Sequence, residues 1–133
     1  MIVVDSSVWI DYFRGDVSPQ TDRLDDLVAQ RRLSTGDLIV AEVLRGFDTD
    51  REFDIAHHLL TSVKIFQLGG LQVAVQAAQN YRRLRSLGIT IRKTIDTIIA
   101  TYCILNGHEL LYSDRDFDPF VKHLGLQSAM SGL

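Results

Sequence analysis

The stretch that decides the fold is Met1-Ile-Val-Val-Asp-Ser-Ser-Val-Trp-Ile10, at the start of the chain. The β-branched run 2–4 predicts a short buried strand, and the apolar spacing over residues 8–13 suits a helix. Asp5 stands at the point where the strand gives way to the helix. The chain therefore opens with a strand, a turn and a helix.

The rest of the sequence continues this alternation of short apolar strands with helices. Pro19, directly after Ser18, predicts the first turn of a second helix, and a long amphipathic helix lies between Gly70 and Gly88. Further strands are predicted at 33–36, 63–66 and 109–112, and further helices at 38–44, after Asp48 or Asp50, and at 94–106. This order predicts one α/β domain over residues 1–133, built on a mainly parallel sheet.

The composition agrees with one globular domain. Among the 133 residues, 46% are hydrophobic, 23% are charged and only two are prolines, which argues against a disordered chain. Cys103 is the one cysteine, so an internal disulfide is impossible, and its apolar neighbours predict a place in the core. The apolar runs are short and the first residues lack a basic leader, so we expect a cytoplasmic protein that binds no membrane.

Four acidic residues stand at positions that a simple core does not explain. Asp5 and Asp114 each follow an apolar strand, and the carboxyl ends of parallel strands converge on one crevice. Glu42 and Asp96 interrupt otherwise apolar helical sequence, where a lone buried carboxylate is unfavourable unless something pairs with it. We therefore expect these four carboxylates to gather at one site.

A cluster of carboxylates favours a particular chemistry. The acids repel one another until a divalent cation sits among them, and oxygen ligands suit Mg²⁺ or Mn²⁺. Two such cations, roughly 3.5 to 4 Å apart, could deprotonate a water and stabilise both oxygens of a phosphodiester during hydrolysis. Asp116 is an additional candidate ligand, and the hydroxyls of Ser6, Ser7 and Ser113 could hold a metal-bound water or a phosphate. No protein nucleophile is needed.

The formal charge of −3 is unexpected for a protein that handles nucleic acid, because phosphate contacts usually require a basic surface. Setting aside the five candidate ligands leaves 12 of the 17 acidic residues against 14 basic ones. With cations bound, the surface that faces a substrate would be mildly positive. Arg92 and Lys93, so near Asp96, are the best candidates for substrate contact.

Each acid also has an ordinary structural explanation. Asp5 could cap the next helix, Asp96 could interact with a helix dipole, and Glu42 could be a half-exposed helix residue. Asp114 and Asp116 could be turn and cap residues. These explanations require separate coincidences, whereas one site accounts for all the acids together.

Local salt bridges are a second alternative. Arg45 lies three residues after Glu42, and Arg92 lies four residues before Asp96. Pairing within these helices would leave Asp5 and Asp114 without an explanation.

The acids and their surroundings resemble those of the PIN-domain nucleases, and particularly the VapC toxins of bacterial toxin–antitoxin pairs. The resemblance covers nearly the whole chain and rests on four motifs in order. They are Met1-Ile-Val-Val-Asp-Ser-Ser-Val-Trp-Ile10, Ala41-Glu-Val-Leu-Arg-Gly46, Ile95-Asp-Thr-Ile-Ile-Ala100 and Leu111-Tyr-Ser-Asp-Arg-Asp-Phe117.

This resemblance implies a Rossmann-like α/β/α domain that cuts RNA with Mg²⁺ or Mn²⁺. The four acids of the family fall on Asp5, Glu42, Asp96 and Asp114, and Asp116 matches an additional acid that can contact metal through water. The terminal motif often has His or Asn where this chain has Ser113.

The resemblance also implies partners. Members of this branch commonly cleave transfer or ribosomal RNA, usually as homodimers. A VapB antitoxin binds DNA and blocks the nuclease site, often with an arginine, in a heterotetramer or a larger complex.

Other protein classes fit less well. Phosphatases that form a phospho-aspartate need an acid two residues after the nucleophile, where this chain has Ser7. The acidic pair and late lysine of receiver domains and a glycine-rich phosphate loop are not evident. A metal- or arginine-peptide-binding module without turnover stays open, as does a PIN-type nuclease that cuts DNA.

Overall fold

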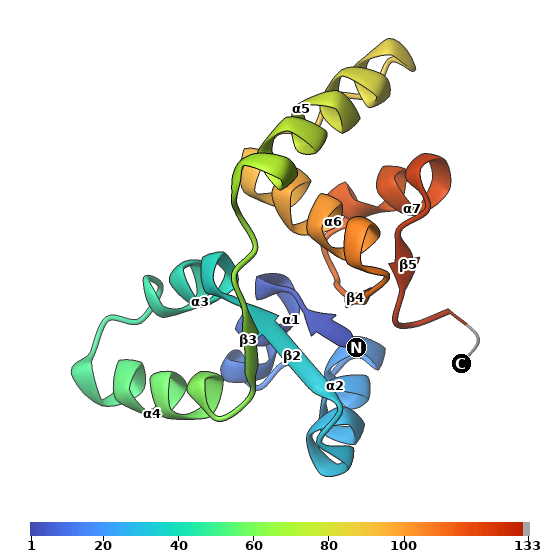
Figure 1. Ribbon diagram of the computed structural model, residues 1–133. Coiled ribbons are helices and arrows are strands. Elements are labelled where there is room, and N and C mark those ends of the chain that lie inside the picture. Colours follow the sequence, from blue (N-terminus) through green and yellow to red (C-terminus); the bar gives the residue numbers. More distant parts are fainter. Residues whose placement is uncertain (132–133) are drawn as a thin grey trace.

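The computed structural model describes residues 1–131, and its centre is a five-stranded parallel sheet with helices around it (Figure 1). The chain begins with β1 (Ile2–Val4) and α1 (Ser6–Arg14). The following elements are α2 (Pro19–Gln30), β2 (Leu33–Gly36), α3 (Asp37–Leu44), α4 (Asp50–Thr61), β3 (Lys64–Phe66), α5 (Leu71–Ser86), α6 (Thr94–Asn106), β4 (Glu109–Leu111), the 3₁₀ helix η1 (Arg115–Phe117), α7 (Asp118–Leu124) and β5 (Gln127–Ser128).

The strand order is β3-β2-β1-β4-β5, and all neighbouring pairs are parallel. From β1 the chain builds outward through β2 and β3, and then returns to place β4 on the other side of β1. The order therefore reverses between β1 and β4. Ligands of open parallel sheets bind at the carboxyl ends of the strands beside such a reversal, and Asp5 and Asp114 follow those two strands.

The junction of β1 with α1 follows from local sequence. Asp5 has extended backbone angles and its side chain accepts a hydrogen bond from the Ser7 N–H, which caps the helix. Gly15 ends the helix in the left-handed conformation, with φ of 79°, where a glycine avoids the strain of a Cβ. Trp9 is fully buried, and its indole N–H donates to the Val4 carbonyl at 3.2 Å.

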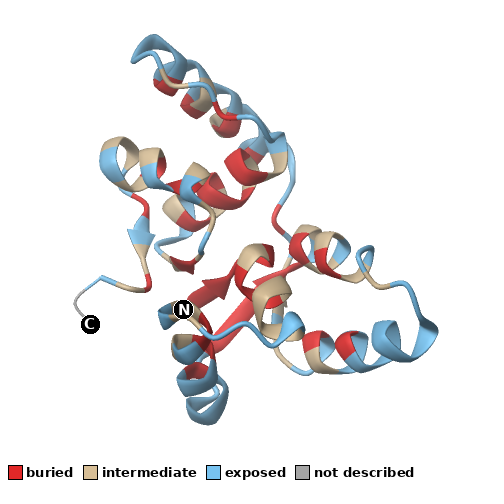
Figure 2. Cartoon of the chain, turned by 180° about the vertical axis from the view of Figure 1, so that it is seen from behind, coloured by how far each residue is buried: buried red, intermediate tan, exposed pale blue. Residues whose placement is uncertain are grey.

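The core lies on both faces of the short strands, which are buried over β1 and β2 (Figure 2). Helices α5, α6 and α7 lie together, and α5 extends away from the sheet (Figure 1). Gly36 is buried at the end of β2, and a Cβ there would run into the Leu68 side chain. The chain between β3 and α5 therefore passes directly over the end of β2.

The predicted fold class is confirmed: the domain is α/β with a parallel central sheet flanked by helices. Cys103 is buried as expected, and burial raises the pKa of its thiol to about 12. The sequence analysis missed η1, α7 and β5. One turn of 3₁₀ helix, a seven-residue helix and two strand residues are too short to show a clear periodicity. Within residues 1–131, no helix has the length and apolar character needed to span a membrane.

Candidate metal centre

Four carboxylates that are distant in sequence line one cavity of about 270 Å³, namely those of Asp5, Glu42, Asp96 and Asp114. Asp5 follows β1, Glu42 lies in α3, Asp96 lies in the first turn of α6, and Asp114 precedes η1. The structure thus brings together the acids that the sequence predicts as one site. Their catalytic role stays a prediction.

Asp5 is held in a defined orientation at the bottom of this cavity, with 2% of its surface exposed. Its Oδ2 accepts hydrogen bonds from the Ser7 N–H at 3.0 Å and the Ser7 hydroxyl at 2.6 Å. Its Oδ1 is buried and has no hydrogen-bond partner among the described residues. Burial raises the pKa of Asp5 to about 6, against the lowering effect of the Ser7 hydrogen bonds, and the charge of Glu42 raises it further.

Asp96 has the same character and comes from another layer of the fold. It is 3% exposed, and its Oδ2 is buried without a partner in the described part of the chain. Burial raises the pKa of Asp96 to about 7, and the charge of Asp5 raises it further, while Lys93 lowers it. The two buried carboxylates of this cavity are therefore both shifted toward the neutral form, chiefly by burial.

Hydroxyl groups orient the acids of the cavity. The Ser6 hydroxyl donates to Glu42 Oε1 at 3.1 Å, and the Ser7 hydroxyl, besides donating to Asp5, accepts the Ser113 N–H at 3.1 Å. Ser7 thereby ties the end of β1 to the segment that carries Asp114. The sequence suggested a water- or phosphate-binding role for these hydroxyls, whereas the structure places those of Ser6 and Ser7 on carboxylates.

Ser113 is not among the residues that line the cavity. Its hydroxyl donates to Asp11 Oδ2 at 3.2 Å, on α1. The substrate contact of Ser113 stays a prediction. Asp11 was not singled out from the sequence, because only the tertiary structure brings α1 against the end of β4.

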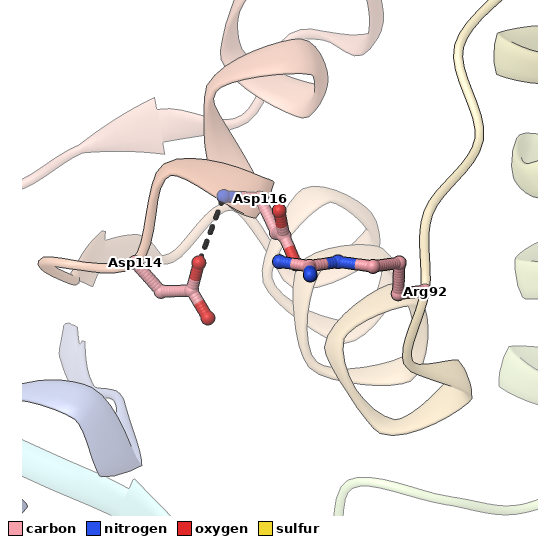
Figure 3. Close-up of polar contacts among 3 residues, drawn as sticks. All are labelled: Arg92, Asp114 and Asp116. Atoms are coloured by element: carbon pink, nitrogen blue, oxygen red, sulfur yellow. Dashed lines mark hydrogen bonds and ion pairs between the residues drawn. The ribbon is translucent and has the colours of Figure 1, made fainter.

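Asp114 and Asp116 are less buried than Asp5 and Asp96 and are the outer acids of the site; Figure 3 shows them with Arg92. Asp114 Oδ1 accepts the Asp116 N–H at 2.9 Å, which makes Asp114 the cap of η1. Arg92 Nη2 lies 3.5 Å from Asp116 Oδ2, and this contact is the one ion pair within residues 1–131. Arg92 is thus paired across the fold with Asp116, and the predicted alternative of a local bridge to Asp96 is not found.

The donor set fits a hard divalent cation. Asp96, Asp114 and Asp116 each offer a carboxylate oxygen, and these oxygens lie within 4.8 Å of one another. The unpartnered oxygens of Asp5 and Asp96 are otherwise unsatisfied buried charges, which a cation would compensate. No cysteine or histidine lines the cavity, so an oxygen-preferring ion such as Mg²⁺ or Mn²⁺ suits it better than zinc.

Three cationic side chains line the same cavity: Arg14, Arg45 and Lys93. Lys93 was expected there from its closeness to Asp96 in sequence. Arg14 was not singled out, and Arg45 was considered only as a local partner for Glu42, with which it forms no ion pair. Their position depends on how α1 and α3 end beside each other, which sequence spacing does not reveal.

Comparison with known proteins gives relatives of nearly equal length. The VapC ribonuclease Mb1587 of Mycobacterium bovis is 28% identical over 131 residues, covering 97% of this chain and 98% of that protein. Ribonuclease VapC11 of Mycobacterium tuberculosis matches with the same identity and coverage.

Solved structures share the fold at lower identity. VapBC from Salmonella typhimurium bound to DNA matches with a TM-score of 0.73 and 14% identity, over 96% of this chain and 95% of that chain. VapC20 of Mycobacterium tuberculosis, a toxin that cleaves the sarcin–ricin loop, matches with a TM-score of 0.67 and 16% identity, over 89% and 93%. The family model of the PIN domain matches residues 2–121. This chain therefore belongs to the PIN domain family.

Proposed function

We propose that this protein is a VapC-type toxin and that it hydrolyses phosphodiester bonds in RNA with Mg²⁺ or Mn²⁺ bound at the acid-lined cavity. The observation that carries the proposal is the pair of buried carboxylate oxygens, on Asp5 and Asp96, that have no partner among the described residues. The names of the relatives support the ribonuclease activity.

The chain itself supplies orientation and charge. Asp5 is held by Ser7 and Glu42 by Ser6, so one oxygen of each carboxylate is fixed in place. When bound, the cation supplies the positive charge that lowers the pKa of a water and stabilises the phosphate during hydrolysis. The ionised forms of Asp5 and Asp96 hold that charge in place. No serine or cysteine nucleophile is required.

The substrate and partners are inferred from the same family relations. We propose transfer or ribosomal RNA as the substrate, in line with the sarcin–ricin loop cleavage that VapC20 performs. We also propose a homodimer and a VapB-type antitoxin partner, since the structural relatives include VapBC complexes bound to DNA. In such an assembly the antitoxin would cover the acidic cavity.

The test is cleavage of total bacterial RNA by purified, antitoxin-free protein in Mg²⁺ or Mn²⁺, with new ends mapped by sequencing. Asp96→Asn removes one buried carboxylate, and the matched control is Asp25→Asn, which changes an exposed acid of α2 outside the cavity. We expect discrete ends with the wild type and the control variant. EDTA and Asp96→Asn should abolish them.

The opposite outcome identifies the alternatives. If folded protein cleaves no RNA but binds an arginine-rich peptide, and metal weakens that binding, the protein is a binding module. If matched DNA is cut and RNA is not, it is a PIN-type deoxyribonuclease. Either result would overturn the proposed function.

A further inference from the structure

The acidic cavity has a basic rim whose cations do not pair with its acids. Arg14, Arg45 and Lys93 line the cavity together with the four carboxylates. Within residues 1–131 the one ion pair joins Arg92 to Asp116, so neither Arg14 nor Arg45 neutralises a carboxylate by direct contact. The partners of Asp5 and Glu42 are instead serine hydroxyls and a backbone N–H. The two guanidinium groups are therefore left with donors to spare.

These arginines come from two different elements that end at the same place. Arg14 is the last residue of α1, and Arg45 is the residue after α3. Both are exposed, and Lys93, which also lines the cavity, precedes α6. A nucleic acid chain that crosses the cavity would therefore meet cations from three elements beside the acids. Cations in these positions suit a bound polyanion. They have no evident use when the cavity is empty.

The chemistry of the arginine side chain favours phosphate as the ligand. The guanidinium carries its charge at every physiological pH and presents donors in a fork that matches phosphate oxygens. The carboxylates repel a phosphodiester when no cation is bound, so cations at the rim are needed to hold the nucleic acid backbone over them. The purely structural explanation is that each arginine interacts with the carboxyl end of its helix. That explanation predicts an effect on stability and none on RNA binding.

We propose that Arg14 and Arg45 bind the RNA phosphates next to the cleaved bond and, together with Lys93, hold the backbone across the cavity. This inference rests on the proposed ribonuclease function and assigns it two substrate-binding residues. Phosphate contacts position a nucleic acid without reading its sequence. The contacts should therefore be measurable on an RNA that is not the physiological target.

The experiment is a fluorescence anisotropy titration of a fluorescein-labelled, mixed-sequence single-stranded RNA, in Ca²⁺ in place of Mg²⁺, over a series of salt concentrations. The variants are Arg14→Gln, Arg45→Gln and the charge-preserving Arg45→Lys. The matched control is Arg32→Gln, which removes the same charge from an exposed residue near the amino ends of the strands. Thermal unfolding of each variant checks that the fold is intact.

We expect Arg14→Gln and Arg45→Gln each to raise the Kd roughly fivefold to tenfold at low salt, and each to reduce the salt slope by about 0.7. Arg45→Lys should recover part of the loss, because a lysine retains the charge without the fork. Arg32→Gln should remain within about twofold of the wild type. In Mg²⁺, KM should rise more than kcat falls.

Two results would overturn the inference. The first is an unchanged Kd and salt slope in both glutamine variants, with a loss of thermal stability alone. This result would mean that each arginine only stabilises the carboxyl end of its helix. A loss no larger than that of Arg32→Gln would reduce them to general surface charge. In either case wild-type cleavage that Asp96→Asn abolishes would leave the ribonuclease function standing, whereas failure of the wild type itself would remove both.

Discussion

The two sides of the acidic cavity differ in how well their carboxylates are satisfied. On the inner side, Asp5 and Asp96 are nearly inaccessible to solvent, and each has an oxygen without a partner among residues 1–131. On the outer side, Asp114 caps η1, and Asp116, whose side chain is 22% exposed, pairs with Arg92. Burial therefore opposes ionisation of the inner acids, whereas the outer acids are only half-buried.

This difference indicates where a bound cation would be stabilised most. Burial and repulsion from neighbouring carboxylates, Glu42 for Asp5 and Asp5 for Asp96, raise the pKa of Asp5 to about 6 and that of Asp96 to about 7. A cation would remove that repulsion and compensate both unpartnered oxygens. Asp116 gains less, because Arg92 already neutralises part of its charge. The inner pair should therefore dominate metal binding and cleavage, and the outer pair should adjust them.

The largest effect should come from an inner acid. Asp96→Asn should lower kcat/KM for RNA roughly a hundredfold to a thousandfold, because it removes a charge that the site provides for the transition state. The same variant, without metal at pH 8, should unfold at a higher temperature than the wild type, because a buried charge is gone. Paired cleavage and thermal unfolding assays test this. A variant that is both inactive and less stable would contradict the idea of a strained inner pair.

The next largest effect should come from Ser7, the residue that orients Asp5. Ser7→Ala removes the hydroxyl that joins Asp5 to the Ser113 N–H, and it should reduce cleavage roughly tenfold to a hundredfold. The Mg²⁺ concentration for half-maximal cleavage should rise. Ser86→Ala, which changes an exposed serine of α5, is the control and should behave as the wild type. Equal activity of both variants would show that Asp5 needs no such support.

The pH dependence tests the raised pKa values directly. Protons compete with the cation for Asp5 and Asp96, so more Mg²⁺ should be needed for half-maximal cleavage at pH 6 than at pH 8, by roughly tenfold. Measuring cleavage against Mg²⁺ concentration at both pH values tests this. A requirement independent of pH would mean that neither acid holds the metal.

The same shifts set the stability of the metal-free protein. Both groups have folded-state pKa values above the ordinary value of 3.8, so between about pH 4 and 7 the folded state binds more protons than the unfolded state. The free energy of unfolding should therefore fall as the pH rises through this window. Saturating Mg²⁺ should remove this decline, because the bound cation replaces the protons on Asp5 and Asp96. Urea unfolding at several pH values, in EDTA and in Mg²⁺, measures both.

The smallest effect should come from the ion pair between Arg92 and Asp116. Asp116→Asn and Arg92→Gln should each change kcat/KM by about fivefold or less, because an exposed ion pair contributes about 1 kcal/mol at most. In the double variant, the effects of the two substitutions on kcat/KM should be nearly additive. A loss with Asp116→Asn as large as that with Asp96→Asn would place Asp116 among the direct metal ligands.

Much of this site was readable from local sequence. The strand, turn and helix at the start of the chain predict that Asp5 lies at a strand end, and Thr94 places Asp96 in a first helical turn. The ordinary explanations and the site explanation also prove compatible. Asp5 caps α1 with Oδ2 while Oδ1 stays free, and Asp114 caps η1 from within the same cavity. A cap therefore does not exclude a second role for the other oxygen.

The sequence by itself determined the fold class and the four acids, because strand-end positions and charges inside apolar helices depend on neighbours along the chain. Only the tertiary structure decided the partners: Ser7 with Ser113, Arg92 with Asp116, and Arg14 beside Arg45. Those contacts join segments as much as 106 residues apart. The packing of helix ends against strand ends sets which side chains meet there, and no local periodicity encodes it.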